Sequence, residues 1–135
     1  MMTENIKALV EYRQTQADES LDASEVLIEK NLLRPSVNRA YYAMFYGVLA
    51  LLAIDKMETS KHGGAISLFD REFVKEGVFT KDFSRWLHDA FDLHQRVDYS
   101  PEYYVSHKEA ERTLKNAVNF VEEVKKQTRS LLSVP

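Results

Sequence analysis

Three side chains in one segment of the sequence are suited to binding a phosphate group. Arg39, Tyr42 and Tyr46 follow one another at steps of three and four residues, which places them on one side of a helix. A guanidinium group is planar and always charged, so it can hold two phosphate oxygens at once, and a tyrosine hydroxyl can donate a further hydrogen bond. The spacing indicates a candidate phosphate or nucleotide site. Arg39 could instead close the fold by pairing with an acid such as Asp98, and the tyrosines could be packing residues.

Two histidines could add acid–base chemistry to this site. His94 falls in the middle of an apolar helix face, and His62 stands at the start of a short helix. An imidazole titrates near neutral pH and can act as a general base or a general acid. His94 could face Arg39 in this role, or it could be a neutral core histidine with one hydrogen-bond partner. His62 could contact an anion at its helix N-terminus, or it could simply line the start of that helix.

Further candidates occur a few residues after His94. Arg96 could contact a nucleotide, or it could pair with Asp92 one turn earlier. Asp98 and Tyr99 could order the following loop, and the Asp98 carboxylate could also orient the guanidinium of the candidate site. The complete set of candidate nucleotide- or RNA-binding residues is Arg39, Tyr42, Tyr46, His62, Arg96, Asp98 and Tyr99.

Other kinds of chemistry are excluded by what the sequence lacks. The chain has no cysteine, so it has neither disulfides nor a thiolate nucleophile. It has no glycine-rich phosphate-binding loop and no metal-site motif, and its four histidines are spread over three or four segments. We therefore expect no metal and no other cofactor. The formal net charge of −3 argues against a non-specific nucleic-acid coat and leaves room for a local contact.

Helices must position these residues. A length of 135 residues suits one domain, and four glycines with three prolines are too few for a turn-rich β-sandwich. Apolar residues recur at three- and four-residue steps, and no alternating strand pattern occurs. The sequence predicts an all-α, antiparallel up-and-down bundle of about five helices, as a single domain over residues 1–135. The helices are expected from about residue 4 to 30, 35 to 55, 60 to 77, 80 to 97 and 106 to 130, with 131–135 as a frayed tail.

The expected second helix, residues 35–55, is apolar or small on two opposite sides. One side carries an ordinary core stripe that includes Tyr41 and Met44, and the other has no carboxylate and no lysine. A helix with two such faces is normally buried on both, so in a small domain we expect the second face to meet another chain or a ligand. The predicted dimer face consists of Arg39, Tyr42, Ala43, Tyr46 and Ala50.

A membrane location is not expected. The longest strongly apolar stretch, residues 40–54, is shorter than the roughly 20 residues that cross a bilayer. The N-terminus has acidic residues and no apolar core of a secretory signal. We therefore expect a soluble, cytoplasmic protein.

Three short motifs occur in the order and spacing of a known family. The string S-x-x-R-x-Y-Y-A-x-F at residues 36–45, then His62-x-Gly64, then Asp98-Tyr99, resembles the HEPN family, the nucleotide-binding domains of higher eukaryotes and prokaryotes. The likeness is to its small stand-alone prokaryotic branch and covers about residues 5–126. It implies an up-and-down helical bundle that is often a homodimer. It also implies a minimal nucleotidyltransferase as partner, encoded beside or fused to the domain, frequently as a toxin–antitoxin pair.

Many HEPN proteins are metal-independent ribonucleases, in which an arginine is followed, after four to six residues, by a histidine. No arginine of this chain has a histidine at that spacing; after Arg39, six intervening residues lead to Tyr46, a poor general base at neutral pH. Three hypotheses remain open. The first is a nucleotide- or RNA-contacting partner of a nucleotidyltransferase. The second is a ribonuclease with Arg39 on the phosphate and His94 or Tyr46 as the acid–base group, and the third is a purely structural dimerisation module.

Overall fold

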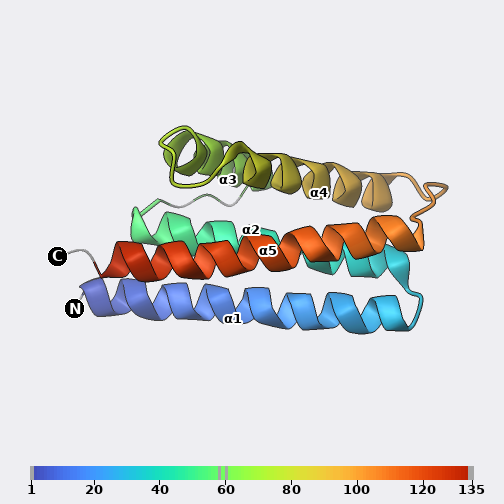
Figure 1. Cartoon of the computed structure of the whole chain (residues 1–135), viewed down its shortest axis with the longest axis horizontal. Helices are drawn as coiled ribbons and strands as arrows, with labels where there is room; N and C mark the ends of the chain where they lie inside the picture. The colour runs from blue at the N-terminus through green and yellow to red at the C-terminus, as the bar shows by residue number, and fades with distance from the viewer. Residues whose placement is uncertain (1, 58, 60, 134–135) are drawn as a thin grey trace.

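The computed structural model of the chain describes residues 2–57, 59 and 61–133. Within these residues the helices are α1 (Met2–Glu29), α2 (Leu33–Ile54), α3 (His62–Phe69), α4 (Lys81–Tyr99) and α5 (His107–Leu132), and α3 continues into a short π-helix, η1 (Asp70–Val74). The long helices α1, α2, α4 and α5 alternate in direction along the chain (Figure 1). The predicted all-α, up-and-down bundle of about five helices is confirmed.

The helix α2 is the central element of this bundle. It lies beside α5 in a middle layer, with α1 on one side of that layer and α3 and α4 on the other (Figure 1). It contacts each of the other four helices. Small residues allow this close packing, because a Cβ atom added to Gly47 would lie 3.3 Å from the side chain of Val124 on α5. One helix can therefore place its side chains against every other layer.

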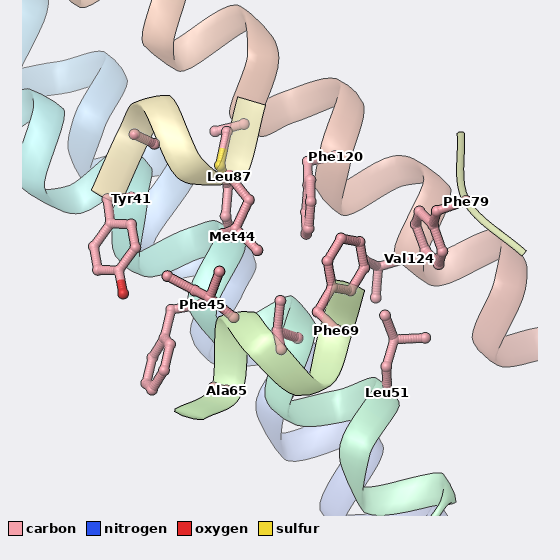
Figure 2. Close-up of a cluster of buried hydrophobic side chains, with 14 of the residues drawn as sticks. Tyr41, Met44, Phe45, Leu51, Ala65, Phe69, Phe79, Leu87, Phe120 and Val124 are labelled. Atoms are coloured by element: carbon pink, nitrogen blue, oxygen red, sulfur yellow. The ribbon is translucent and has the colours of Figure 1, made fainter. Parts of the chain in front are cut away.

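The largest buried cluster fills the space between α2, α5 and the α3–α4 layer (Figure 2). Its centre is aromatic: the ring of Phe69 lies 5.1 Å from that of Phe79 and 5.3 Å from that of Phe120, measured between centroids. Tyr41 and Phe45 lie at one edge of the cluster (Figure 2). Burial of this apolar surface is the main force that holds the layers together, and the edge at Tyr41 is where polar groups join the core.

Part of the predicted dimer face is wrong, because the chain covers it by itself. Ala43 clusters with Ala17 of α1 and Val121 of α5, and Ala50 clusters with Val10 of α1. Both Ala43 and Ala50 are fully buried in a single chain. With 28 residues, α1 is long enough to run along the whole of α2. The residues of that face that keep exposed surface are Arg39, Tyr42 and Tyr46.

Several helix ends differ from the prediction by two or three residues; η1 ends at Val74 rather than residue 77, and α4 ends at Tyr99 rather than residue 97. The helix α2 begins two residues before Pro35, which is tolerated in the first turn because its missing N–H would have no helical partner there. The helix α5 continues through Leu132 and is not frayed at residue 131, because Leu131 packs against the main core and Leu132 against the cluster around Val10. Residues 134–135 of the predicted tail lie outside the described residues.

The apolar stretch is longer than the sequence suggested. With 22 residues, α2 is long and apolar enough to cross a membrane by length and composition alone. Most of it is buried inside the bundle, as is usual for the core helix of a soluble protein. Its hydrophobicity is thus accounted for by packing within the fold.

Candidate functional site

Side chains from α2, α3 and α4 meet at the edge of the core and form the candidate site. The ring of Tyr41 on α2 lies 4.8 Å from that of His94 on α4 and 5.6 Å from that of His62 at the start of α3, measured between centroids. The two imidazole rings are 6.3 Å apart. The neighbouring ring of Tyr42 stands edge-on to both, at 5.4 Å from His94 and 5.6 Å from His62. Three helices therefore bring both histidines to the same part of α2.

His94 is held by two polar side chains. Its Nδ1 lies 2.8 Å from Oδ1 of Asn38, whose Nδ2 donates to Asp98 Oδ1 at 3.1 Å. An ionised carboxylate only accepts hydrogen bonds, so the amide nitrogen of Asn38 must face Asp98 and its oxygen must face His94. Nδ1 of His94 then carries the proton. In the neutral ring Nε2 bears the lone pair, and it lies 3.4 Å from Asp98 Oδ2.

The environment favours the neutral form of His94. Burial lowers the pKa of His94, and the nearby His62 and Arg39 lower it further, against the opposing effect of Asp98. Only 8% of the residue is exposed. A neutral imidazole with an unprotonated Nε2 is the form that can accept a proton, and the Asp98 carboxylate 3.4 Å away would stabilise that proton once it is bound.

Arg39 has a guanidinium group that is not used by the fold. It lies over the ring of Tyr42, 4.7 Å from the centroid. In the described part of the chain, no hydrogen bond or ion pair joins Arg39 to another side chain. The expected pairing with Asp98 is not present, since that carboxylate accepts a hydrogen bond from Asn38 instead. Stacking on Tyr42 thus orients a guanidinium whose donors remain available to an anion.

Tyr46 lies beside this cluster and faces a different space. Its ring is 6.0 Å from that of Tyr42. With Arg39, it lines a hollow between α1 and α2 whose other wall includes Gln16 and Ala23. Arg39 therefore borders both the histidine cluster and this hollow.

Besides Tyr46, two of the predicted site residues do not join the others. Arg96 lines a polar cleft between α4 and α5, where its guanidinium lies 5.8 Å from the ring of Tyr103. Tyr99 is 80% exposed at the end of α4. The predicted residues that the structure brings together are Arg39, Tyr42, His62, His94 and Asp98.

Asn38 and Tyr41 belong to the site but were not among the predicted residues. Tyr41 has the helical spacing of the core stripe and is fully buried, so its apolar ring conceals the role of its hydroxyl, which lies 2.6 Å from Nδ1 of His62. Asn38 is one of the few polar residues in a largely apolar helix, which is a signal that sequence reasoning could have used. Both residues lie inside the motif at residues 36–45.

Comparisons with known proteins show the family of the chain. A family model described as the HEPN domain matches residues 10–127. The chain belongs to the HEPN family. The resemblance predicted from the three motifs is thereby confirmed, and it extends over both histidines and the α2 motif.

Related HEPN proteins include small proteins of archaea and bacteria. "Putative toxin MJ0605" of Methanocaldococcus jannaschii is 35% identical over 129 residues, which cover 96% of this chain and 92% of the relative. A "UPF0332 protein" of Thermotoga maritima is 32% identical, over 91% of this chain and 93% of the relative. "Putative toxin MJ0142" of Methanocaldococcus jannaschii is 33% identical, over 82% of this chain and 75% of the relative. Two of these three relatives thus carry a toxin name.

Proposed function

We propose that this HEPN protein is a toxin-type module that contacts the phosphate of a nucleotide or RNA at the site of Arg39, His62 and His94. The observation that carries the proposal is the guanidinium of Arg39, which is stacked on the ring of Tyr42 at 4.7 Å, while the same ring contacts both histidines. An arginine without a hydrogen-bond or ion-pair partner among the described residues is suited to a planar oxyanion. The toxin names of two relatives support the same role.

The charge distribution favours a local contact over a broad one. The chain as a whole carries a net charge of −3, so long-range attraction of nucleic acid is weak. The two histidines are neutral at pH 7, because burial lowers the pKa of each. The positive charge at the site is therefore that of Arg39, next to neutral groups that can donate or accept hydrogen bonds.

A metal-independent ribonuclease is the second candidate, favoured by the neutral state of His94. Its Nε2 could take the proton of a ribose 2′-OH; the oxygen would then attack phosphorus, the P–O5′ bond would break, and the departing oxygen would take a proton from water. The products would be a 2′,3′-cyclic phosphate and a 5′-hydroxyl. If so, His94 on α4 takes the place of the motif histidine, which is absent from the sequence after Arg39.

The likeness to the small prokaryotic HEPN branch supports further proposals about partners. A homodimer, a minimal nucleotidyltransferase as the antitoxin and a cytoplasmic location are typical of that branch. Arg39, Tyr42 and Tyr46 keep exposed surface where a second molecule could approach. A location away from membranes is consistent with the mostly buried α2.

A binding and cleavage experiment tests both candidates. We expect a fluorescein-labelled single-stranded RNA to bind the wild-type chain and to bind Arg39→Ala at least about tenfold more weakly, since one charge-assisted contact contributes roughly 1.5–3 kcal/mol. The matched control is Arg129→Ala, which removes an exposed arginine on α5. Fluorescence anisotropy gives the affinities. Equal affinity of Arg39→Ala and the wild type contradicts the proposed site.

The same samples, incubated with EDTA and separated on a denaturing gel, distinguish binding from catalysis. Cleavage by the wild type that is lost in His94→Gln supports the ribonuclease. Binding that depends on Arg39 without any cleavage supports a module that contacts RNA and does not cut it.

A further inference from the structure

The hydroxyl of Tyr41 determines how His62 presents its ring to the site. Tyr41 is fully buried, and its hydroxyl oxygen lies 2.6 Å from Nδ1 of His62. No other hydrogen-bond partner of this hydroxyl occurs among the described residues. Burial raises the pKa of Tyr41 well above its ordinary value, so the phenol keeps its proton.

The direction of this hydrogen bond follows from what the buried proton needs. If Nδ1 of His62 donated to Tyr41, the phenolic proton would be left in the core without an acceptor, which is costly. The hydroxyl must therefore donate, and Nδ1 must accept. The proton of the neutral imidazole is then on Nε2. Burial also lowers the pKa of His62, so the neutral ring is the form present at pH 7.

Nε2 of His62 is the end of the ring that reaches outward. Nε2 has no hydrogen-bond partner in the described part of the chain. Every buried side-chain nitrogen or oxygen there has such a partner, so Nε2 must be open to solvent. The ring itself is fixed, because it stacks on Phe45 with centroids 4.2 Å apart and planes within 10°. His62 thus offers a rigid N–H donor at the edge of the site.

We propose that His62 binds a phosphate oxygen as a neutral imidazole through its Nε2–H, at the site where Arg39 and His62 both contact the ring of Tyr42, and that Tyr41 is the positioning residue that holds this tautomer. The inference rests on the proposed phosphate contact at Arg39 and adds its second donor. It assigns a role to a core tyrosine that does not itself touch the ligand.

The two histidines then have opposite polarity. Asn38 and Asp98 leave the Nε2 of His94 as an acceptor, whereas Tyr41 makes the Nε2 of His62 a donor. A donor suits a phosphate oxygen, and an acceptor suits a hydroxyl group. The ligand class that matches this arrangement is a phosphate ester with a hydroxyl close to the phosphate.

A metal-ligand role for His62 fits the structure less well. Its Nδ1 is already occupied by Tyr41. Among the described residues no three His, Cys, Asp or Glu side chains are grouped as a metal site would require.

The titratable or charged groups around His62 are Tyr41 and Tyr42 on α2 and His94 on α4, with Arg39 and Asp98 next to His94. A neutral donor avoids adding a second positive charge beside Arg39.

Nitrogen NMR on the full chain tests the tautomer directly. At pH 7 we expect the ¹⁵N shifts of His62 to report a protonated Nε2 and an unprotonated Nδ1. In Tyr41→Phe, which keeps the ring in the core, the same signals should shift toward a mixture of tautomers. The matched control is Tyr103→Phe, which removes a hydroxyl bonded to Glu109 elsewhere in the fold. A wild-type His62 protonated on Nδ1, or unchanged shifts in Tyr41→Phe, overturns the proposal.

Binding of the fluorescein-labelled single-stranded RNA tests the donor. We expect His62→Ala to bind the RNA about tenfold more weakly, because it loses one hydrogen bond to the phosphate. Tyr41→Phe should bind about threefold more weakly, because it keeps that donor but loses its alignment. His62→Gln, whose amide can place an N–H near the position of Nε2, should restore most of the affinity. If Arg39→Ala binds poorly while His62→Ala and Tyr41→Phe bind like the wild type, the role of His62 is wrong and the Arg39 contact stands. If Arg39→Ala itself binds like the wild type, the phosphate site is contradicted, and the role of His62 with it.

Discussion

At the scale of single residues, the site depends on hydrogen bonds between polar groups at the edge of the core. The Tyr41 hydroxyl and the Asn38 amide each hold one histidine, and no buried side-chain nitrogen or oxygen in the described residues lacks a partner. Each of these hydrogen bonds leaves one proton position possible on its imidazole. Such networks are sensitive to loss of a single member, because the remaining group is left unpaired in a region of low dielectric.

The two neutral histidines predict a stability that falls on acidification. The ordinary pKa of the side chain, 6.5, applies in the unfolded chain, and burial lowers the pKa of both His62 and His94 in the folded protein. Below about pH 6.5 the unfolded state therefore binds more protons, so the free energy of unfolding decreases as the pH falls toward the folded pKa values. Above pH 6.5 this contribution is constant.

Urea unfolding between pH 7.5 and 5.5 measures this dependence. The double variant His62→Gln/His94→Gln should show a shallower decline than the wild type. His88→Gln is the control, since His88 is half exposed and bonded to Asp70 away from the site. If the free energy of unfolding falls equally steeply with pH in the wild type and the double variant, these two imidazole rings do not cause the pH dependence.

At the scale of elements, Arg34 ties the start of α2 to the end of α4. Its guanidinium donates to the backbone carbonyls of Val97 and Tyr103 and, at 3.4 Å, to that of Ser100. These carbonyls belong to the last turn of α4 and the loop after it, where a helix leaves acceptors unpaired. Asp98 lies in the same turn, so Arg34 also helps to hold the carboxylate that faces His94.

We expect Arg34→Met to loosen this end of α4. Removal of a charged donor from backbone acceptors should lower the free energy of unfolding by about 1–3 kcal/mol. Amides of residues 97–104 should exchange hydrogen faster, while those of α1 keep their rates. Urea titration and hydrogen-exchange mass spectrometry measure the two effects, with Arg129→Met as the exposed control. Unchanged exchange over residues 97–104 would show that the anchor is not needed.

Helical periodicity was sufficient to predict the elements but not what covers them. The uncharged second side of α2 was visible in the sequence, yet α1 of the same chain covers Ala43 and Ala50. A periodic pattern indicates that a face is buried and does not say by which element. The position of His94 opposite Arg39 was one of two alternatives, and the polar partners that decide it come from other helices. Contacts between distant segments are set by packing and leave no local pattern.

At the scale of the whole molecule, the exposed surface around Arg39 continues onto α1. The hollow beside Arg39 and Tyr46 is walled by Gln16 and Ala23, and the same helix exposes two large apolar side chains nearer its start, Leu9 and Tyr12, at 38% and 57%. In a monomer such side chains would remain in water. A second copy packed against α1 and the open part of α2 would bury them.

This surface predicts that a proposed homodimer would depend on Ala23. In sedimentation equilibrium the wild type should have twice the 15.7 kDa mass of one chain. Ala23→Arg adds a long charged side chain at the hollow and retains a good helix former, so the fold should persist while the dimer dissociates. Glu122→Arg, at an exposed position on α5, should remain dimeric. A wild-type monomer would contradict the dimer, and a dimeric Ala23→Arg would place the interface elsewhere. Because Arg39 borders the same hollow, a dimer formed there would also bring a partner molecule close to the phosphate-binding guanidinium, so RNA affinity should fall together with dimerisation in Ala23→Arg.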